Sequence, residues 1–508
     1  MTRGILQEVE KPPTVLSMEE YQRDWQPQGW QLIIIGPTST WRQDWGEWEA
    51  IRDIVQNALD ECEYYTWGYD SEGLYIRDVG KGIAIADFLL GPPKLKPDHA
   101  RGKFGEGMKI AALALLRQGY SVKVETKGRK LWIIFLEQKV NGRAQTLAAI
   151  WKPNGSTRSG TTFYIGGYKG SAFEDRFAVN LPRSSIVAEA PSSITGPYRR
   201  KNQLIKHTFP YGQSRIFARD IYMREINSPY SYNLWSFPLA ADRHAPKNEQ
   251  DLWTDIGRLW SCVTRLEQLK VFLKMIKSPP LLETDESRMV NMTSWDMGIE
   301  PVTGKEYGSF VKDNASVWQE AWRSIMGDNA VIRTSDRLDG MVKHLGYQSV
   351  SLLWSVTDVL SKIVATDKEI VKTSQERLRE VEVIPDDKLE RHHLAHLKLA
   401  RALASRIFFT PPAVFVAVIP PASDRVRTAG MYSTSTGEIY ISLEMMERGK
   451  TMIDTLVHEM AHHRQYRSDG EAADLTPSHA AAMTVIAAEV VSAIAGKGLD
   501  AMLQEVNW

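Results

Sequence analysis

Cysteine is scarce in this sequence of 508 residues, since it occurs only at Cys62 and Cys262. Two cysteines exclude a disulfide scaffold and an all-cysteine zinc site, and such scarcity is typical of a reducing compartment. Net charge is absent too: 62 basic residues balance 62 acidic ones, so no overall field draws the chain to nucleic acid or an anionic membrane. No apolar run approaches the roughly 18 residues that a spanning helix needs. We therefore expect a soluble, cytoplasmic protein with no membrane segment.

The patterns that are present change along the chain, which is longer than one hydrophobic core usually organises. Up to about residue 170, helical periodicity alternates with the strand-like runs GLYIRDVG, YSVKVETK, KLWIIFLE and GTTFYIGG. A second mixed segment has IFARDIYMREI as its clearest strand. In the helical region that follows, QERLREVEVIPDDKLERHHLAHLKLARALASRI is expected to form a helical hairpin. The last hundred residues predict a strand (PAVFVAVI), a hairpin (MYSTSTGEIYIS) and a helix that carries HEMAH.

These patterns predict a multidomain α+β protein of five parts. They are an N-terminal extension, irregular apart from QLIIIG (1–40), an α/β sandwich domain (41–175), a second α/β segment (176–250), a helical linker domain (251–405) and a C-terminal α+β domain (406–508).

Four motifs before residue 170 make chemical sense together. In IRDIVQNALDEC, Asp53, Asn57, Asp60 and Glu61 recur near helical spacing, and a carboxylate and an amide four residues apart can place a water and a magnesium ion. In RDVGKGI a strand delivers Asp78, and two glycines, Gly80 and Gly82, allow a ligand to approach the backbone.

The other two motifs are also rich in glycine. RGKFGEGMKIAALALL places Gly102, Gly105 and Gly107 before a helix, whose N-terminus can hold phosphates. In SGTTFYI, Thr161 opens a strand directly after Gly160.

By the order and spacing of these motifs, residues 45 to 170 resemble the GHKL ATPase superfamily, which includes the ATP-binding chain of DNA gyrase, MutL, MORC proteins and histidine kinases. The resemblance implies a Bergerat-type α/β sandwich that binds ATP and Mg²⁺. Asn57 would ligate magnesium, Asp78 would accept the adenine amino group, the glycines from 102 to 107 would form the ATP lid, and Thr161 would support the water network. The remaining residues expected at the nucleotide are Asp60, Gly80, Gly82, Lys103, Met108 and Lys109.

One position departs from the hydrolytic members, which carry glutamate as general base four residues before the asparagine. This chain has Asp53 there, and its shorter side chain would hold the attacking water farther from the nucleotide. Alternatively, Glu49 one turn earlier takes the place of Asp53 as general base. We therefore predict ATP binding, with slow hydrolysis catalysed by Asp53. The segment after the sandwich resembles the transducer of such ATPases and suggests Arg243, in AADRH, as a γ-phosphate contact.

The C-terminal stretch TLVHEMAHHRQ carries a second kind of chemistry. On a helix His458 and His462 share one face and suit a single zinc ion, and Glu459 beside them can act as general base on water. His463 points about 100° away around the helix and is expected to be a bystander. The third ligand is expected to be His479, seventeen residues after His462, with Glu489 as the competing candidate.

HEMAH followed by SHAAAM resembles the SprT and Spartan-type zinc metallopeptidases over residues 410 to 495. The resemblance implies a zincin-like α+β domain with a histidine as third ligand. It also implies that the strand GEIYIS is an edge that binds a substrate peptide as an added strand.

Two hypotheses follow from these motifs. In the first, ATP binding closes or dimerises the N-terminal module and thereby controls a zinc metallopeptidase that acts on a protein substrate. In the second, the chain is an ATPase clamp on nucleic acid or nucleoprotein, with an accessory zinc domain. The basic clusters YRRKNQLIK and TKGRK support this alternative, whereas the zero net charge argues against it.

Overall fold

The computed structural model describes residues 11–62, 64–89, 107–139, 143–170, 173–192, 200–209, 212–240, 245–286, 304–474 and 476–508. The chain divides into two compact units, one of residues 1–263 and 284–310 and the other of residues 264–283 and 311–508. The first unit combines helices with largely antiparallel sheets and the second combines helices with parallel and mixed sheets, so the expectation of a multidomain α+β protein is confirmed.

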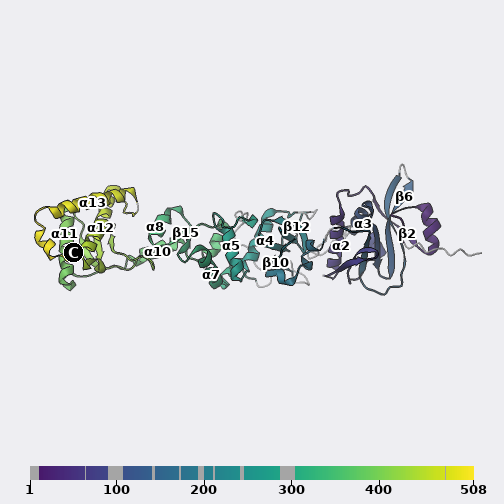
Figure 1. Ribbon diagram of the computed structural model, residues 1–508, viewed down its shortest axis with the longest axis horizontal. Coiled ribbons are helices and arrows are strands. Elements are labelled where there is room, and N and C mark those ends of the chain that lie inside the picture. The colour runs from purple at the N-terminus through teal and green to yellow at the C-terminus, as the bar shows by residue number, and fades with distance from the viewer. Residues whose placement is uncertain are drawn as a thin grey trace, which may run out of the picture. The chain divides into compact units, whose positions relative to one another are not determined.

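The first unit begins with an eight-stranded sheet (Figure 1). Seven of its strands follow the order β2-β7-β6-β5-β8-β4-β3, and the eighth, β1, pairs in parallel with β6. Every strand-like run predicted before residue 170 is a strand of this sheet. The strands are β1 (Val15–Ser17), β2 (Gln31–Thr38), β3 (Thr66–Asp70), β4 (Gly73–Arg77), β5 (Ser121–Thr126), β6 (Arg129–Lys139), β7 (Arg143–Pro153) and β8 (Thr161–Gly166).

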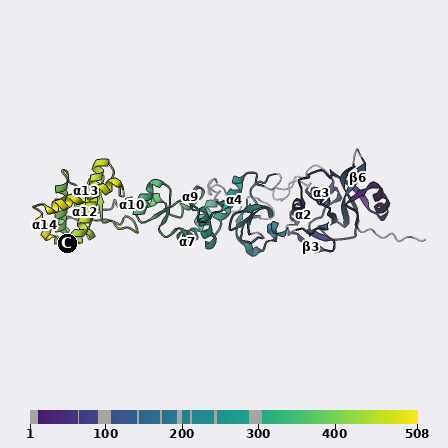
Figure 2. The same ribbon diagram turned by 45° about the horizontal axis from the view of Figure 1, so that its top comes forward.

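Both faces of this sheet are covered. On one face lie α2 (Glu47–Cys62) and α3 (Gly107–Arg117), whose apolar residues join the main core (Figures 1 and 2). The other face packs against the N-terminal segment, where Tyr21, Trp25 and Trp30 meet Trp132 in a second core. Residues 11–40 are therefore not an irregular extension: β1, α1 (Met18–Glu20) and β2 are integral, because the outward apolar side chains of β6 and β7 need a cover.

A five-stranded sheet in the order β12-β11-β13-β10-β9 follows, and α4 (Glu249–Ser261) packs on it. IFARDIYMREI, predicted as one strand, is a hairpin that turns at Arg219 and Asp220, both with positive φ. Asn233 holds this turn, because its side chain accepts from the Asp220 N–H and donates to the Asp220 carboxylate. The strands are β9 (Ile186–Pro191), β10 (Lys201–Ile205), β11 (Ser214–Ala218), β12 (Ile221–Ile226) and β13 (Ser231–Leu234).

The region expected to be helical also contains a parallel pair of short strands, β14 and β15. Its helix α8 packs with β15 and α10 around a small core that also takes in Ala422. The elements are α5 (Leu266–Ile276), α6 (Tyr307–Asp313), α7 (Ala315–Met326), β14 (Ala330–Ile332), α8 (Asp339–His344), β15 (Gln348–Val350), α9 (Trp354–Leu360) and α10 (Asp367–Arg377).

The C-terminal sheet has the order β16-β17-β19-β18, and helices α11 to α13 share its core (Figure 1). The predicted helical hairpin is wrong, because β16 separates α10 from α11 and pairs with β17. The apolar face of α11 places it in this core, so the C-terminal part begins before residue 406. The elements are β16 (Glu382–Val383), α11 (Arg391–Ile407), β17 (Val414–Val418), β18 (Gly430–Tyr432), β19 (Ile439–Ser442), α12 (Gly449–Asp469), α13 (Pro477–Ala495) and α14 (Asp500–Glu505).

Among the helices that the structure describes, α13 is long and apolar enough to cross a membrane by length and composition, a feature that the search for an unbroken apolar run missed. Ala482, Ile486 and Val490 of α13 instead pack into the C-terminal core. Only 22% of the apolar window of α13 is buried, so most of this helix lies outside that core.

Candidate functional site

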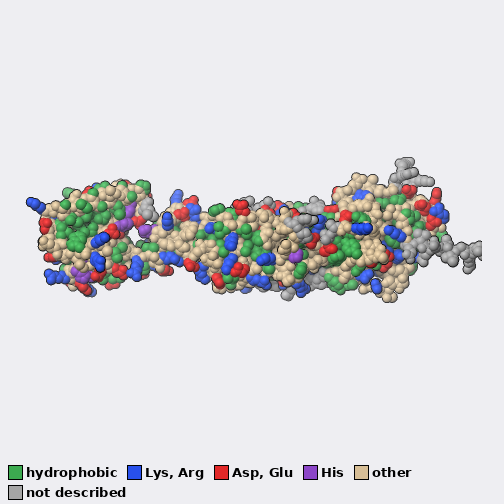
Figure 3. All heavy atoms as spheres, viewed as in Figure 1, with side chains coloured by type: hydrophobic (Ala, Val, Ile, Leu, Met, Phe, Trp, Pro, Cys, Tyr) green, Lys and Arg blue, Asp and Glu red, His purple; other side chains and the backbone are tan. Residues whose placement is uncertain are grey.

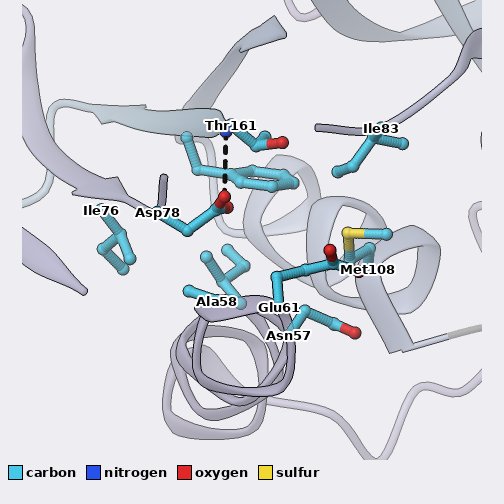
Figure 4. Close-up of a pocket in the computed structure, with 10 residues that line it drawn as sticks. Asn57, Ala58, Glu61, Ile76, Asp78, Ile83, Met108 and Thr161 are labelled. Atoms are coloured by element: carbon cyan, nitrogen blue, oxygen red, sulfur yellow. Dashed lines mark hydrogen bonds between the residues drawn. The ribbon is translucent and has the colours of Figure 1, made fainter. Parts of the chain in front are cut away.

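A pocket in the first unit lies between α2 and the ends of β4 and β8, as Figure 4 shows. It encloses about 40 Å³, room for about three water molecules, so a purine base enters only if lining side chains move. The residues that line it are Ile54, Asn57, Ala58, Glu61, Ile76, Asp78, Ile83, Met108, Thr161 and Phe163. Asn57, Asp78, Met108 and Thr161, expected at a nucleotide from four separate motifs, are thus brought together.

Asp78 is the buried acid of this pocket. Its Oδ1 accepts hydrogen bonds from the N–H groups of Gly80 (2.8 Å) and Thr161 (3.2 Å), the second of which is drawn in Figure 4. Gly160 is required behind it, because a Cβ there would lie 2.1 Å from the Asp78 carbonyl oxygen. Burial raises the pKa of Asp78, despite these two bonds. With Oδ1 occupied, Oδ2 is the oxygen left to accept from a ligand.

One face of α2 forms the opposite wall of the pocket. Asn57 and Glu61 lie one turn apart on that face, and the Asn57 amide donates to the Asp53 carbonyl oxygen (2.7 Å). Asp60, expected at the nucleotide, does not line the pocket, whereas Glu61 does. Helical spacing from Asn57 favours Glu61, because residues four apart share a face.

The two candidate general bases of α2 are engaged elsewhere. The buried Asp53 carboxylate pairs with Arg52 (3.2 Å) and lies against Gly107, where a Cβ would come within 2.0 Å of Asp53 Oδ2. Glu49 accepts from the Gly46 N–H (2.9 Å) near the start of the helix. This arrangement leaves neither carboxylate lining the pocket.

The remaining nucleotide candidates divide into three groups. Lys109 is buried and donates to the Leu89 carbonyl oxygen, and it does not line the pocket. Gly82, in the turn after Asp78, has a positive φ (75°) and packs against Thr126. Four further candidates lie outside the described residues: Gly102, Lys103, Gly105 and Arg243.

The C-terminal part brings three histidines and an aspartate together around one point. His458 and His462 come from α12, His479 from the first turn of α13, and Asp474 from the loop between these helices. One potential ligand atom from each of the four lies within 4.8 Å of all the others. Histidine side chains reach the surface in this part of the molecule (Figure 3). His479 thus joins as expected, whereas the sequence analysis did not identify Asp474.

The donor set fits a divalent metal ion such as zinc by two observations. The Nε2 atoms of His458 and His462 are 3.2 Å apart, close to the about 3.3 Å between two nitrogens that bind one tetrahedral zinc. His479 Nε2 is buried without a hydrogen-bond partner among the described residues, and unpaired buried nitrogens are costly. His462 Nδ1 is buried and unpartnered as well, although liganding histidines usually donate this second N–H.

Glu459 lies beside this cluster and is 5% exposed. Burial raises its pKa to about 7, although the neighbouring His458 and His462 and the Tyr432 N–H act to lower it. Strand β18 covers it closely, since a Cβ on Gly430 would lie 2.9 Å from Glu459 Oε1.

Two other polar residues of these helices lie apart from the cluster. His463 packs edge-on against Phe408 and Tyr432, in keeping with its expected role as a bystander. Glu489, the competing third ligand, instead pairs with Arg464 (2.8 Å).

The strand expected to bind a peptide is not an edge. GEIYIS contains β19, which lies between β17 and β18, so the open edge next to Glu459 is β18. The Ser442 N–H donates to Ala429 and the Ser433 N–H to Glu438. In an antiparallel ladder this alternation turns the backbone groups of Gly430 and Tyr432 away from β19, and of these the Tyr432 N–H already donates to Glu459.

No protein-family model matches the chain. An uncharacterized protein of Mycoplasma pneumoniae (strain ATCC 29342 / M129 / Subtype 1) is 25% identical over 172 residues, which cover 31% of this chain and 70% of that protein. Because that relative is itself uncharacterized, the residues and geometry of this chain carry the functional argument.

Proposed function

We propose that this protein is a zinc-dependent peptidase of the cytoplasm, of the SprT/Spartan-like zincin type, whose N-terminal GHKL-like domain binds ATP and controls proteolysis. The observation that carries the proposal is the convergence of three histidines beside the buried carboxyl of Glu459. A zinc ion, when bound, would supply Lewis-acid activation of water and of a peptide carbonyl.

The roles of the protein groups in this reaction follow from their positions. His458, His462 and His479 would hold the ion. Glu459 would take a proton from the attacking water and pass it to the departing amine, because its carboxyl lies buried beside the histidines that would hold the ion. A substrate peptide would add to the outward backbone groups of β18, which passes directly over Glu459.

The nucleotide part of the proposal is supported by the pocket of the first unit. Asp78 offers a buried carboxylate oxygen to an adenine amino group, and Asn57 offers an amide to a magnesium ion. Since Asp53 is paired with Arg52, we propose that ATP acts mainly by binding, including by promoting a homodimer. Slow hydrolysis is compatible with this arrangement.

The nucleic-acid clamp receives less support. In the basic clusters, Arg129 and Lys130 lie over Trp151 and Trp132, Arg200 lies over Trp235, and Lys201 pairs with Glu189. These residues already have protein partners, and the chain has no net positive charge.

The test is cleavage of a proteome-derived peptide library by the purified, zinc-loaded chain, read by mass spectrometry with and without ATP. We expect new termini with the wild type, at least a hundredfold fewer with Glu459→Gln, and a yield that changes with ATP. Glu471→Gln serves as the matched control, because Glu471 is an exposed acid outside the cluster.

Cleavage that persists in Glu459→Gln would remove the proposed chemistry. Cleavage that needs Glu459 but ignores ATP and a non-hydrolysable analogue would retain the peptidase and remove its nucleotide control.

A further inference from the structure

The loop between α12 and α13 adds a carboxylate to the three histidines. Asp474 Oδ1 lies 2.9 Å from His462 Nε2 and 3.1 Å from His458 Nε2. These distances resemble the 3.2 Å between the two imidazole nitrogens themselves. Asp474 is therefore spaced from both histidines as a further ligand of the same ion would be.

The number of protein ligands distinguishes two kinds of zinc site. Catalytic sites use three and leave one position open, whereas structural sites are closed by four. Here the four donors form a closed set, yet the buried Glu459 beside them has no purpose in a purely structural site. The two observations agree if the fourth protein ligand is removable.

The second oxygen of Asp474 is held from another element. His344, at the end of α8, places its Nε2 3.5 Å from Asp474 Oδ2. The residue after His344 also contacts the chain before β18, because Ser423 donates to the Leu345 carbonyl oxygen (2.8 Å), and Arg377 at the end of the neighbouring helix α10 pairs with Asp424 (2.8 Å). The α8 region thus contacts both the fourth donor and the segment that leads to the strand over Glu459.

We propose that Asp474 is a fourth, detachable zinc ligand, that His344 holds it in place, and that the structure therefore represents a latent form of the peptidase. This inference rests on the proposed function. Movement of α8 away from the loop would release Asp474 and open the fourth position to water and substrate.

The test uses the full chain loaded with cobalt(II), whose visible absorption reports the number and kind of ligands, together with azide as a small anion that binds only at an open position. In the wild type we expect a mainly four-coordinate spectrum that azide shifts far less than that of Asp474→Asn, because only the minor open form, which cleaves peptides, admits the anion. In Asp474→Asn azide should shift the spectrum, and zinc should bind about tenfold to a hundredfold more weakly. In His344→Ala azide should shift the spectrum partially, while zinc affinity falls less.

Glu471→Gln, in the same loop, is the matched control and should behave as the wild type. Circular dichroism of each variant shows that it is folded. A wild-type spectrum that azide shifts as fully as that of Asp474→Asn, or equal zinc affinity in the two proteins, would overturn the role of Asp474 and leave the peptidase intact. Failure of the folded wild type to bind either metal would overturn the proposed function as well.

Discussion

Replacement of Asp78 by asparagine should change which base the pocket accepts. The aspartate Oδ1 is occupied by the N–H groups of Gly80 and Thr161, so an asparagine keeps these bonds with its own oxygen. Its NH₂ group then takes the place of Oδ2 and presents a donor where the wild type presents an acceptor. The amino group of adenine would face this donor, whereas the carbonyl of hypoxanthine would accept from it.

The expected loss of ATP affinity follows from the hydrogen bond between Asp78 Oδ2 and the adenine amino group, which the asparagine removes. A hydrogen bond to a charged group contributes about 1.5–3 kcal/mol, which corresponds to roughly a 10- to 150-fold weaker Kd for ATP. ITP should lose less or gain, because its base carbonyl pairs with the new donor. Burial of Asp78, which is 7% exposed, places the change at the upper end of this range.

Isothermal titration of ATP and ITP into both proteins measures the effect. Asp70→Asn is the matched control, since Asp70 is an exposed acid on β3 outside the pocket. Equal losses for ATP and ITP would refute recognition of the base by Asp78. Unchanged ATP affinity in Asp78→Asn would refute the assignment of the pocket.

Three further changes test other parts of the structure. Burial raises the pKa of Asp255 from 3.8 to about 7, so the native state keeps a proton that the unfolded chain loses between these pH values, and the stability of the protein falls as pH rises from 3.8 to 7. Asp255→Asn should therefore stabilise the protein by up to about 4 kcal/mol at pH 8 and by little near pH 4, as measured by urea unfolding. Equal gains at the two pH values would contradict this reasoning. Gly107→Ala places a Cβ 2.0 Å from Asp53 Oδ2 and should destabilise by about 1–3 kcal/mol, whereas the control Gly340→Ala, with open space around it, should stabilise slightly. Zinc at a hundredfold excess over its Kd should raise stability by about 3 kcal/mol, a chelator should reverse this, and a similar gain in His462→Ala would exclude the site.

Local periodicity determined much of this protein without reference to its fold. Alternating apolar residues specified the strands β4, β5, β6 and β8, and 3.6-residue periodicity placed His458 and His462 on one face of a helix. These features depend on residues a few positions apart, so the sequence alone suffices. The expectation that His479 joins these two histidines drew on the resemblance to SprT-type peptidases, and the structure places His479 beside them.

Tertiary structure decided what depends on distant partners. The turn at Arg219 and Asp220 needs Asn233 from another strand, and β18 rather than β19 is the edge because β17 pairs with β19. Asp53 faces Arg52 and Gly107 in a buried setting that its helical position does not reveal. Asp474 joins the histidines only because the loop after α12 folds back over them. Each of these outcomes depends on which groups burial brings together, and that property belongs to the folded chain as a whole.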